Sequence, residues 1–113
     1  MNWIAVLAAL SGAMAVAAGA FGAHGAQGHA VEWLKTGGQY QLIHAVAALV
    51  ALQLGARTPA ALFVGGGLVF AATLYLMALG LPRWLGAVTP IGGAAMIAGW
   101  LWLAWVLASK AGR

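Results

Sequence analysis

Residues 3–23 read WIAVLAALSGAMAVAAGAFGA and contain no ionisable side chain. At about 1.5 Å per residue, a helix of this length crosses a bilayer hydrocarbon core of about 30 Å. The run is long and no lysine or arginine precedes it, which favours a membrane-spanning helix over a cleaved signal peptide. This stretch therefore predicts a fold built from helices that cross a membrane.

The whole chain has the composition of an integral membrane protein. Of its 113 residues, 65% are hydrophobic and only 5% are charged, with five basic side chains and one acidic one. A soluble domain has about 25% charged residues, and a soluble chain this apolar could not cover its own surface with polar groups. The basic residues are isolated from one another, which indicates membrane anchoring and excludes a nucleic-acid-binding patch.

Three further apolar runs cover about residues 39–55, 60–80 and 88–108. All four runs must be helices, because an open strand in lipid would leave backbone groups unpaired and four segments cannot close a barrel. The sequence predicts one all-α membrane domain over residues 1–113, an up-and-down bundle of four transmembrane helices. An interfacial helical segment is expected at 24–38, between the first two spans. Thr89-Pro90 is typical of a helix start, because threonine can accept a capping hydrogen bond and proline there loses none.

The side chains available limit the chemistry. The chain has no cysteine, and Glu32 is its single acidic residue. Disulfides, thiol nucleophiles and a carboxylate pair within one chain are therefore excluded. His24 and His44 raise the alternative of haem or metal ligation, but no histidine is paired at i, i+4 with another ligand. We expect a protein that is not an enzyme and that has no cofactor or metal site.

Several polar side chains are predicted to meet near one membrane interface. The first helix ends, the second begins, the third ends and the fourth begins on the side opposite the termini. The residues at these positions are His24, Tyr40, Gln41, His44, Tyr75 and Thr89. Polar groups below the interface are costly unless they are paired. Their grouping predicts either hydrogen bonds that tie the helices together or a site for a lipid or small molecule.

Small residues recur at helical spacing on the first run and on the fourth. The stripes are Ser11, Ala15, Gly19 and Ala23, and then Gly92, Ala95 and Gly99. Such stripes let helix backbones approach closely in lipid, so we expect them to serve packing, with a substrate passage as the alternative.

The basic side chains are almost evenly divided between the two membrane sides. Arg57, Lys110 and Arg113 lie on the side of the termini, and Lys35 and Arg83 lie on the other. The positive-inside rule therefore favours cytoplasmic termini. The near balance leaves dual insertion and an antiparallel dimer open.

Short motifs follow one another along the chain in a recognisable order. They are Gly19-Ala20-Phe21-Gly22-Ala23-His24, Trp33-Leu34-Lys35-Thr36-Gly37, Tyr40-Gln41 with His44, Leu74-Tyr75, Thr89-Pro90-Ile91-Gly92-Gly93 and Gly99-Trp100. Together they resemble the family catalogued as domain of unknown function 423, which includes bacterial inner-membrane proteins and the eukaryotic transmembrane protein 256 group. Residues 70–75 depart from the family, reading FAATLY where it usually has FSGSLY. The resemblance implies a small multi-pass protein of the bacterial inner or mitochondrial inner membrane, and it supplies no activity.

Three functions are compatible with these features. The first is a structural or accessory component of the bacterial inner membrane that contacts lipids and packs against itself or a larger membrane complex. The second is a binding module for a lipid or quinone-like molecule, with His24, Tyr40, His44 and Tyr75 as polar contacts. The third is a small dimeric transporter. Transport ranks last, because cation-coupled transporters usually carry an intramembrane carboxylate and residues 3–23 have none.

Overall fold

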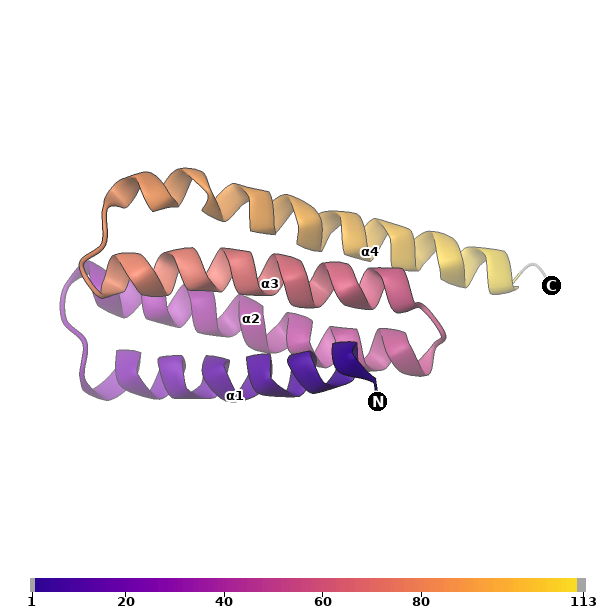
Figure 1. Cartoon of the computed structure of the whole chain (residues 1–113), viewed down its shortest axis with the longest axis horizontal. Coiled ribbons are helices and arrows are strands. Elements are labelled where there is room, and N and C mark those ends of the chain that lie inside the picture. Colours follow the sequence, from indigo (N-terminus) through magenta and orange to yellow (C-terminus); the bar gives the residue numbers. More distant parts are fainter. Residues whose placement is uncertain (1, 112–113) are drawn as a thin grey trace.

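The computed structural model describes residues 2–111, and this part of the chain is entirely helical in its regular structure (Figure 1). The helices are α1 (Trp3–His24), α2 (His29–Gln53), α3 (Arg57–Ala78) and α4 (Thr89–Ala111), with a short 3₁₀ helix, η1 (Arg83–Ala87), before α4. Consecutive helices run in opposite directions along a molecule 52 Å long (Figure 1). The predicted all-helical fold is thus confirmed.

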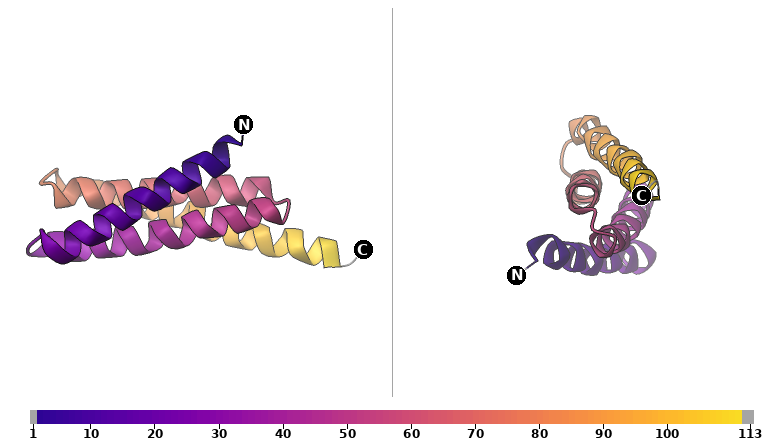
Figure 2. Two further views of the ribbon diagram at one scale, coloured as in Figure 1. Left: turned by 90° about the horizontal axis from the view of Figure 1, so that it is seen from below. Right: turned by 90° about the vertical axis from the view of Figure 1, so that its right-hand side faces the viewer.

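The helices lie in the order of the sequence. α2 packs against α1 and α3, and α4 packs against α3. Seen end-on, the four helices form an open arc with α1 and α4 at its edges, and α1 crosses α2 obliquely (Figure 2). Large apolar side chains on the two edge helices face outward, and those at least 60% exposed include Trp3, Leu10, Leu101 and Trp105. Such surfaces need an apolar environment, which lipid supplies.

Three segments are long and apolar enough to cross a membrane: Trp3–His24, Arg57–Ala78 and Arg83–Lys110. α2 has 25 residues and is also long enough, but polar side chains continue along it from His29 to His44 and lower its hydropathy. The structure therefore gives three candidate spans and a fourth helix of mixed polarity between two of them.

The interfacial segment predicted at 24–38 is not a separate element. Residues 29–38 form the first turns of α2, which continues through Gly37 and Gly38 without a break. A Cβ atom on Gly37 would lie 2.8 Å from the Tyr75 ring, and one on Gly38 would lie 3.1 Å from the Ala15 carbonyl oxygen. The two glycines therefore let α3 and α1 approach α2, and this packing outweighs their low helix propensity.

Small residues also set the distance between α3 and α4. A Cβ on Gly92 would lie 2.6 Å from the Gly66 carbonyl oxygen, and one on Gly99 would lie 2.8 Å from the Phe63 ring. Phe63 is fully buried in a core whose other members are mostly alanines of α1, α2 and α3. The stripe expected on the fourth run thus faces α3 and serves close packing.

Candidate functional site

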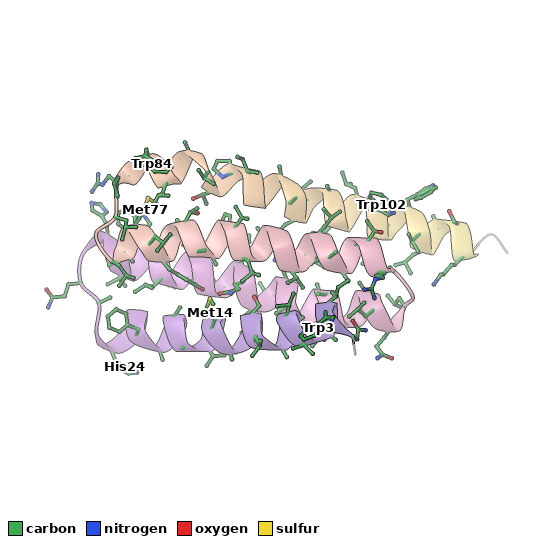
Figure 3. All side chains as sticks on the ribbon, in the orientation of Figure 1. Trp3, Met14, His24, Met77, Trp84 and Trp102 are labelled. Carbon is green, nitrogen blue, oxygen red and sulfur yellow. The ribbon has the colours of Figure 1, made fainter. Side chains whose placement is uncertain are left out.

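Gln41 lies at the centre of a polar network that joins three helices. Its side chain is 1% exposed. Its Nε2 atom donates to Ser11 Oγ of α1 at 2.9 Å, and its Oε1 atom accepts from the Tyr75 hydroxyl of α3 at 2.6 Å. The same nitrogen lies 3.4 Å from the sulfur of Met14, which Figure 3 shows between α1 and α2. Because a thioether can only accept, the Met14 contact fixes which end of the amide carries the nitrogen.

His44 lies one turn further along α2 and connects it to α4. Its Nδ1 atom is 2.6 Å from the Tyr40 carbonyl oxygen, and its Nε2 atom accepts from the Trp100 indole N–H at 3.0 Å. A carbonyl can only accept and an indole N–H can only donate, so the ring is neutral and carries its proton on Nδ1. Both nitrogens therefore have partners, and in this arrangement neither has a lone pair free for haem or a metal ion.

A pair of threonines connects the start of α4 to α3. The hydroxyl oxygens of Thr73 and Thr89 are 2.6 Å apart. Thr73 also donates to the carbonyl oxygens of Val69 and Phe70, and Thr89 lies 3.4 Å from the Leu85 carbonyl oxygen. α4 begins at Thr89 as the sequence predicts, but the hydroxyl expected to cap that helix instead contacts the Thr73 hydroxyl of α3 and the Leu85 carbonyl oxygen.

The structure brings most of the predicted polar residues together and leaves His24 apart. Gln41 bonds Tyr75 directly, and Tyr40 stacks on His44 with ring centroids 6.3 Å apart. His24 is exposed as the last residue of α1, and Figure 3 shows it at the outer end of the molecule. The prediction placed His44 in the first turns of a helix starting at residue 39, but α2 begins at His29, so His44 lies about 22 Å along it from the end that follows His24.

The polar network thus consists of three separate hydrogen-bonded groups, around Gln41, around His44 and at the Thr73–Thr89 pair. Four of their members were not among the predicted site residues: Ser11, Met14, Thr73 and Trp100. The sequence held a signal for two of them. A tryptophan deep in an apolar run needs an acceptor for its N–H, and the imidazole of His44 is such an acceptor. Ser11 is the only hydroxyl within residues 3–23, so it is the natural partner for a buried polar group on a neighbouring helix.

An open cavity of about 390 Å³ lies beside the network, between α2, α3 and α4. Its lining is mostly aromatic and apolar, and Thr36 and Tyr40 contribute hydroxyl groups. The lining residues are Thr36, Tyr40, His44, Phe70, Gly93, Met96, Ile97 and Trp100. A second cavity of similar volume lies between α1 and α2. Both volumes fall in the range of small-molecule sites, about 300–1,000 Å³.

Residues 18–93 match a protein family described as "Protein of unknown function (DUF423)". The chain belongs to the DUF423 family. Most of the polar network lies inside the matched DUF423 region, while Ser11, Met14 and Trp100 lie outside it. The resemblance drawn from the ordered motifs is thus confirmed.

Relatives of this DUF423 chain that are named UPF0382 membrane protein are similar over almost their whole length. One from Haemophilus influenzae is 38% identical over 92% of each chain. One from Staphylococcus aureus (strain bovine RF122 / ET3-1) is 36% identical over 91% of this chain and 93% of the relative, and one from Staphylococcus epidermidis is 38% identical over 89% and 91%. No solved structure matches the chain significantly. The relatives and the apolar helices together make this a membrane protein.

Proposed function

We propose that this DUF423 protein is a structural or accessory component of the bacterial inner membrane and is not an enzyme. The observation that carries this proposal is that buried polar side chains bond one another between helices. Gln41 joins α1, α2 and α3, His44 joins α2 and α4, and Thr89 joins α4 and α3. Groups used in this way hold helices in place instead of presenting reactive atoms.

We further propose that all four helices cross the membrane. α2 packs between two apolar helices, and its deepest polar groups, Gln41 and His44, are buried and hydrogen-bonded. Its charged side chains, Glu32 and Lys35, lie near its start, where a long side chain such as that of Lys35 reaches the interface. An even number of crossings places both termini on one side, and the basic residues favour the cytoplasm.

The apolar faces of the two edge helices support an assembly larger than one chain, in the form of a homo-oligomer or of contacts with another membrane protein. Native mass spectrometry from lipid nanodiscs measures assembly size and bound small molecules together. We expect several chains per particle, or one chain with a protein partner, and no small molecule other than lipid in fixed ratio. A stoichiometric non-lipid molecule would contradict the structural role.

The second function we consider is a ligand-binding module, favoured by the cavity between α2 and α4. Tyr40 and Trp100 border it, and Thr36 provides a hydroxyl group. This lining suits a flat apolar ring with polar substituents, such as a quinone headgroup. A leucine side chain at Gly93 would occupy the cavity, since the nearest atom to a Cβ there is on the Phe70 ring at 3.9 Å. If a quinone binds here, it should raise the melting temperature of the wild type and leave that of Gly93→Leu unchanged.

A further inference from the structure

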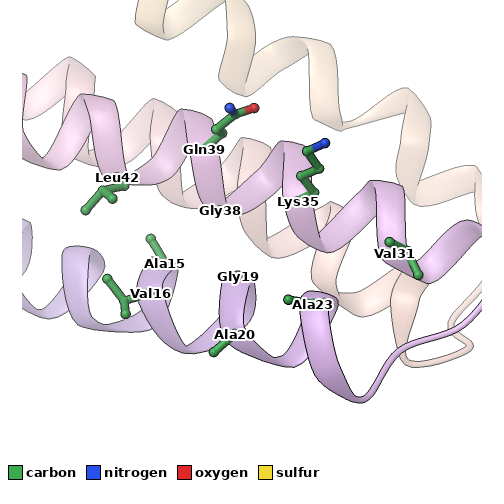
Figure 4. Close-up of a pocket in the computed structure, with 11 residues that line it drawn as sticks. Ala15, Val16, Gly19, Ala20, Ala23, Val31, Lys35, Gly38, Gln39 and Leu42 are labelled. Atoms are coloured by element: carbon green, nitrogen blue, oxygen red, sulfur yellow. The ribbon is translucent and has the colours of Figure 1, made fainter.

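The second cavity is an apolar groove between α1 and α2, separate from the cavity beside the polar network. Gly19, Ala20 and Ala23 form its α1 side, while Lys35, Gln39 and Leu42 border it from α2 (Figure 4). Its volume is about 390 Å³. The walls are apolar, and the polar ends of Lys35 and Gln39 stand at the α2 edge and point away from α1 in Figure 4. The groove therefore combines space for an apolar chain with a cation at one edge.

The charge at this end of the molecule favours an anionic occupant. Lys35 and Arg83 lie at the end that holds the α1–α2 connection, and Glu32, the single acidic side chain, lies at the same end. Two cationic side chains and one carboxylate therefore leave this end with one net positive charge. Arg83 lies over the Trp33 ring, with its guanidinium carbon 5.7 Å from the ring centroid. Lys35 lines the groove and Arg83 does not, so Lys35 is the cation at the groove.

We propose that this groove binds an anionic phospholipid, with one acyl chain along the apolar wall and the phosphate at Lys35. Lys35 lies within two turns of the start of α2, so its ammonium group can extend to the level of lipid headgroups. A hydrocarbon chain fits a wall of glycine and alanine, because these residues leave the groove open. This inference goes beyond the structural role and does not depend on the assembly size.

The groove can be filled without disturbing the helix contacts. A Cβ atom at Gly19 would meet nothing within 4 Å, so a leucine side chain there can enter the groove. Gly65 of α3 provides a matched control, because a Cβ at that helical glycine also meets nothing within 4 Å and the residue lies outside the groove. For the charge, Lys35→Gln has a matched control in Lys110→Gln, which removes the other lysine at the opposite end of the molecule.

The test is native mass spectrometry of the full chain in detergent with added phosphatidylglycerol or phosphatidylcholine. The wild type should retain phosphatidylglycerol in preference to phosphatidylcholine. Lys35→Gln should lower that preference about fivefold, the effect expected for one basic residue near an anionic headgroup. Gly19→Leu should reduce retention of both lipids, and Gly65→Leu and Lys110→Gln should behave as the wild type.

Three results would overturn the proposal. Equal retention of the two lipids by the wild type would remove the role of Lys35. Unchanged retention in Gly19→Leu would show that the acyl chain lies elsewhere. A dimer that disappears in Gly19→Leu while lipid retention persists would assign the groove to a second copy of the chain. Because Lys35 is exposed, the Lys35→Gln variant should fold normally. A melting temperature equal to that of the wild type would show this.

Discussion

The imidazole of His44 connects two helices only in one protonation and tautomeric form. Its Nδ1–H donates within α2, so its Nε2 is free to accept from Trp100 of α4. The rings of Phe63 and Trp100 make T-shaped contacts with the same imidazole, with centroids 5.6 Å and 5.8 Å away. His44 thus contributes both a hydrogen bond and ring packing at the contact between α2 and α4.

We expect His44→Ala to lower thermal stability in detergent more than His29→Ala. Loss of the ring leaves the Trp100 N–H without an acceptor, and interhelical hydrogen bonds in membrane helices contribute about 0.6–2 kcal/mol. His29 is exposed and stacks only on Trp33, with ring centroids 5.7 Å apart. Melting curves followed by circular dichroism measure the difference, and equal melting temperatures would refute the prediction.

Gln41→Leu and Gln39→Leu test the network with the same change two residues apart. Gln41 is buried and bonds Ser11 and Tyr75, whereas Gln39 is exposed. Leucine at position 41 leaves the Tyr75 hydroxyl without its acceptor, so we expect a loss of about 0.6–2 kcal/mol, as for other interhelical bonds. Chemical denaturation of both variants under the same conditions gives the difference in their free energies of unfolding. A Gln41→Leu variant as stable as Gln39→Leu would mean that the network adds nothing to stability.

Contacts between whole helices depend on glycines that face a neighbouring backbone. Gly92 of α4 meets Gly66 of α3, and Gly38 of α2 meets Ala15 and Gly19 of α1. In lipid, where apolar surfaces gain little from meeting each other, close backbone approach supplies much of the packing energy. The helices thus meet where side chains are smallest.

Gly92→Ala and Gly65→Ala should change stability in opposite directions. Alanine normally stabilises a helix relative to glycine by about 0.5–1 kcal/mol, and Gly65 has open space for the added methyl group. At Gly92 the methyl group would lie 2.5 Å from the Phe70 backbone nitrogen, so the helices must separate. We expect Gly92→Ala to cost about 1–3 kcal/mol, as overpacked cores do. Chemical denaturation would show this, and a Gly92 variant at least as stable as the wild type would contradict the packing described here.

The apolar runs predicted the existence of the four helices, because length and hydropathy are local properties of the sequence. The continuity of α2 was not predictable in the same way. Gly37 and Gly38 resemble a helix break until Tyr75 and Ala15 are known to lie against them. Depth alone placed Gln41 near Tyr75, but the rotation of each helix about its axis decides which faces meet. The sequence therefore indicated that Trp100 needs an acceptor without showing that α2 turns His44 toward it.

At the scale of the whole molecule, the order of the helices predicts a labelling pattern. The chain has no cysteine, so single cysteines can be placed at Gln27, Thr58 and Ser109. If all four helices cross, a membrane-impermeant maleimide should reach position 27 from one side of the membrane and positions 58 and 109 from the other. Labelling of 27 and 58 from the same side would show that α2 does not cross, and labelling of each site from both sides would indicate dual insertion.

The bond between His44 and Trp100 has a consequence for biosynthesis. The two residues are 56 positions apart, so the imidazole of α2 is made well before the indole of α4 that completes its bonding. If α2 crosses the membrane as proposed, the Nε2 atom of His44 must until then hydrogen-bond water or another protein, because an unpaired polar group is costly in lipid. The hydrogen bonds of α2 are therefore complete only after α4 has been synthesised.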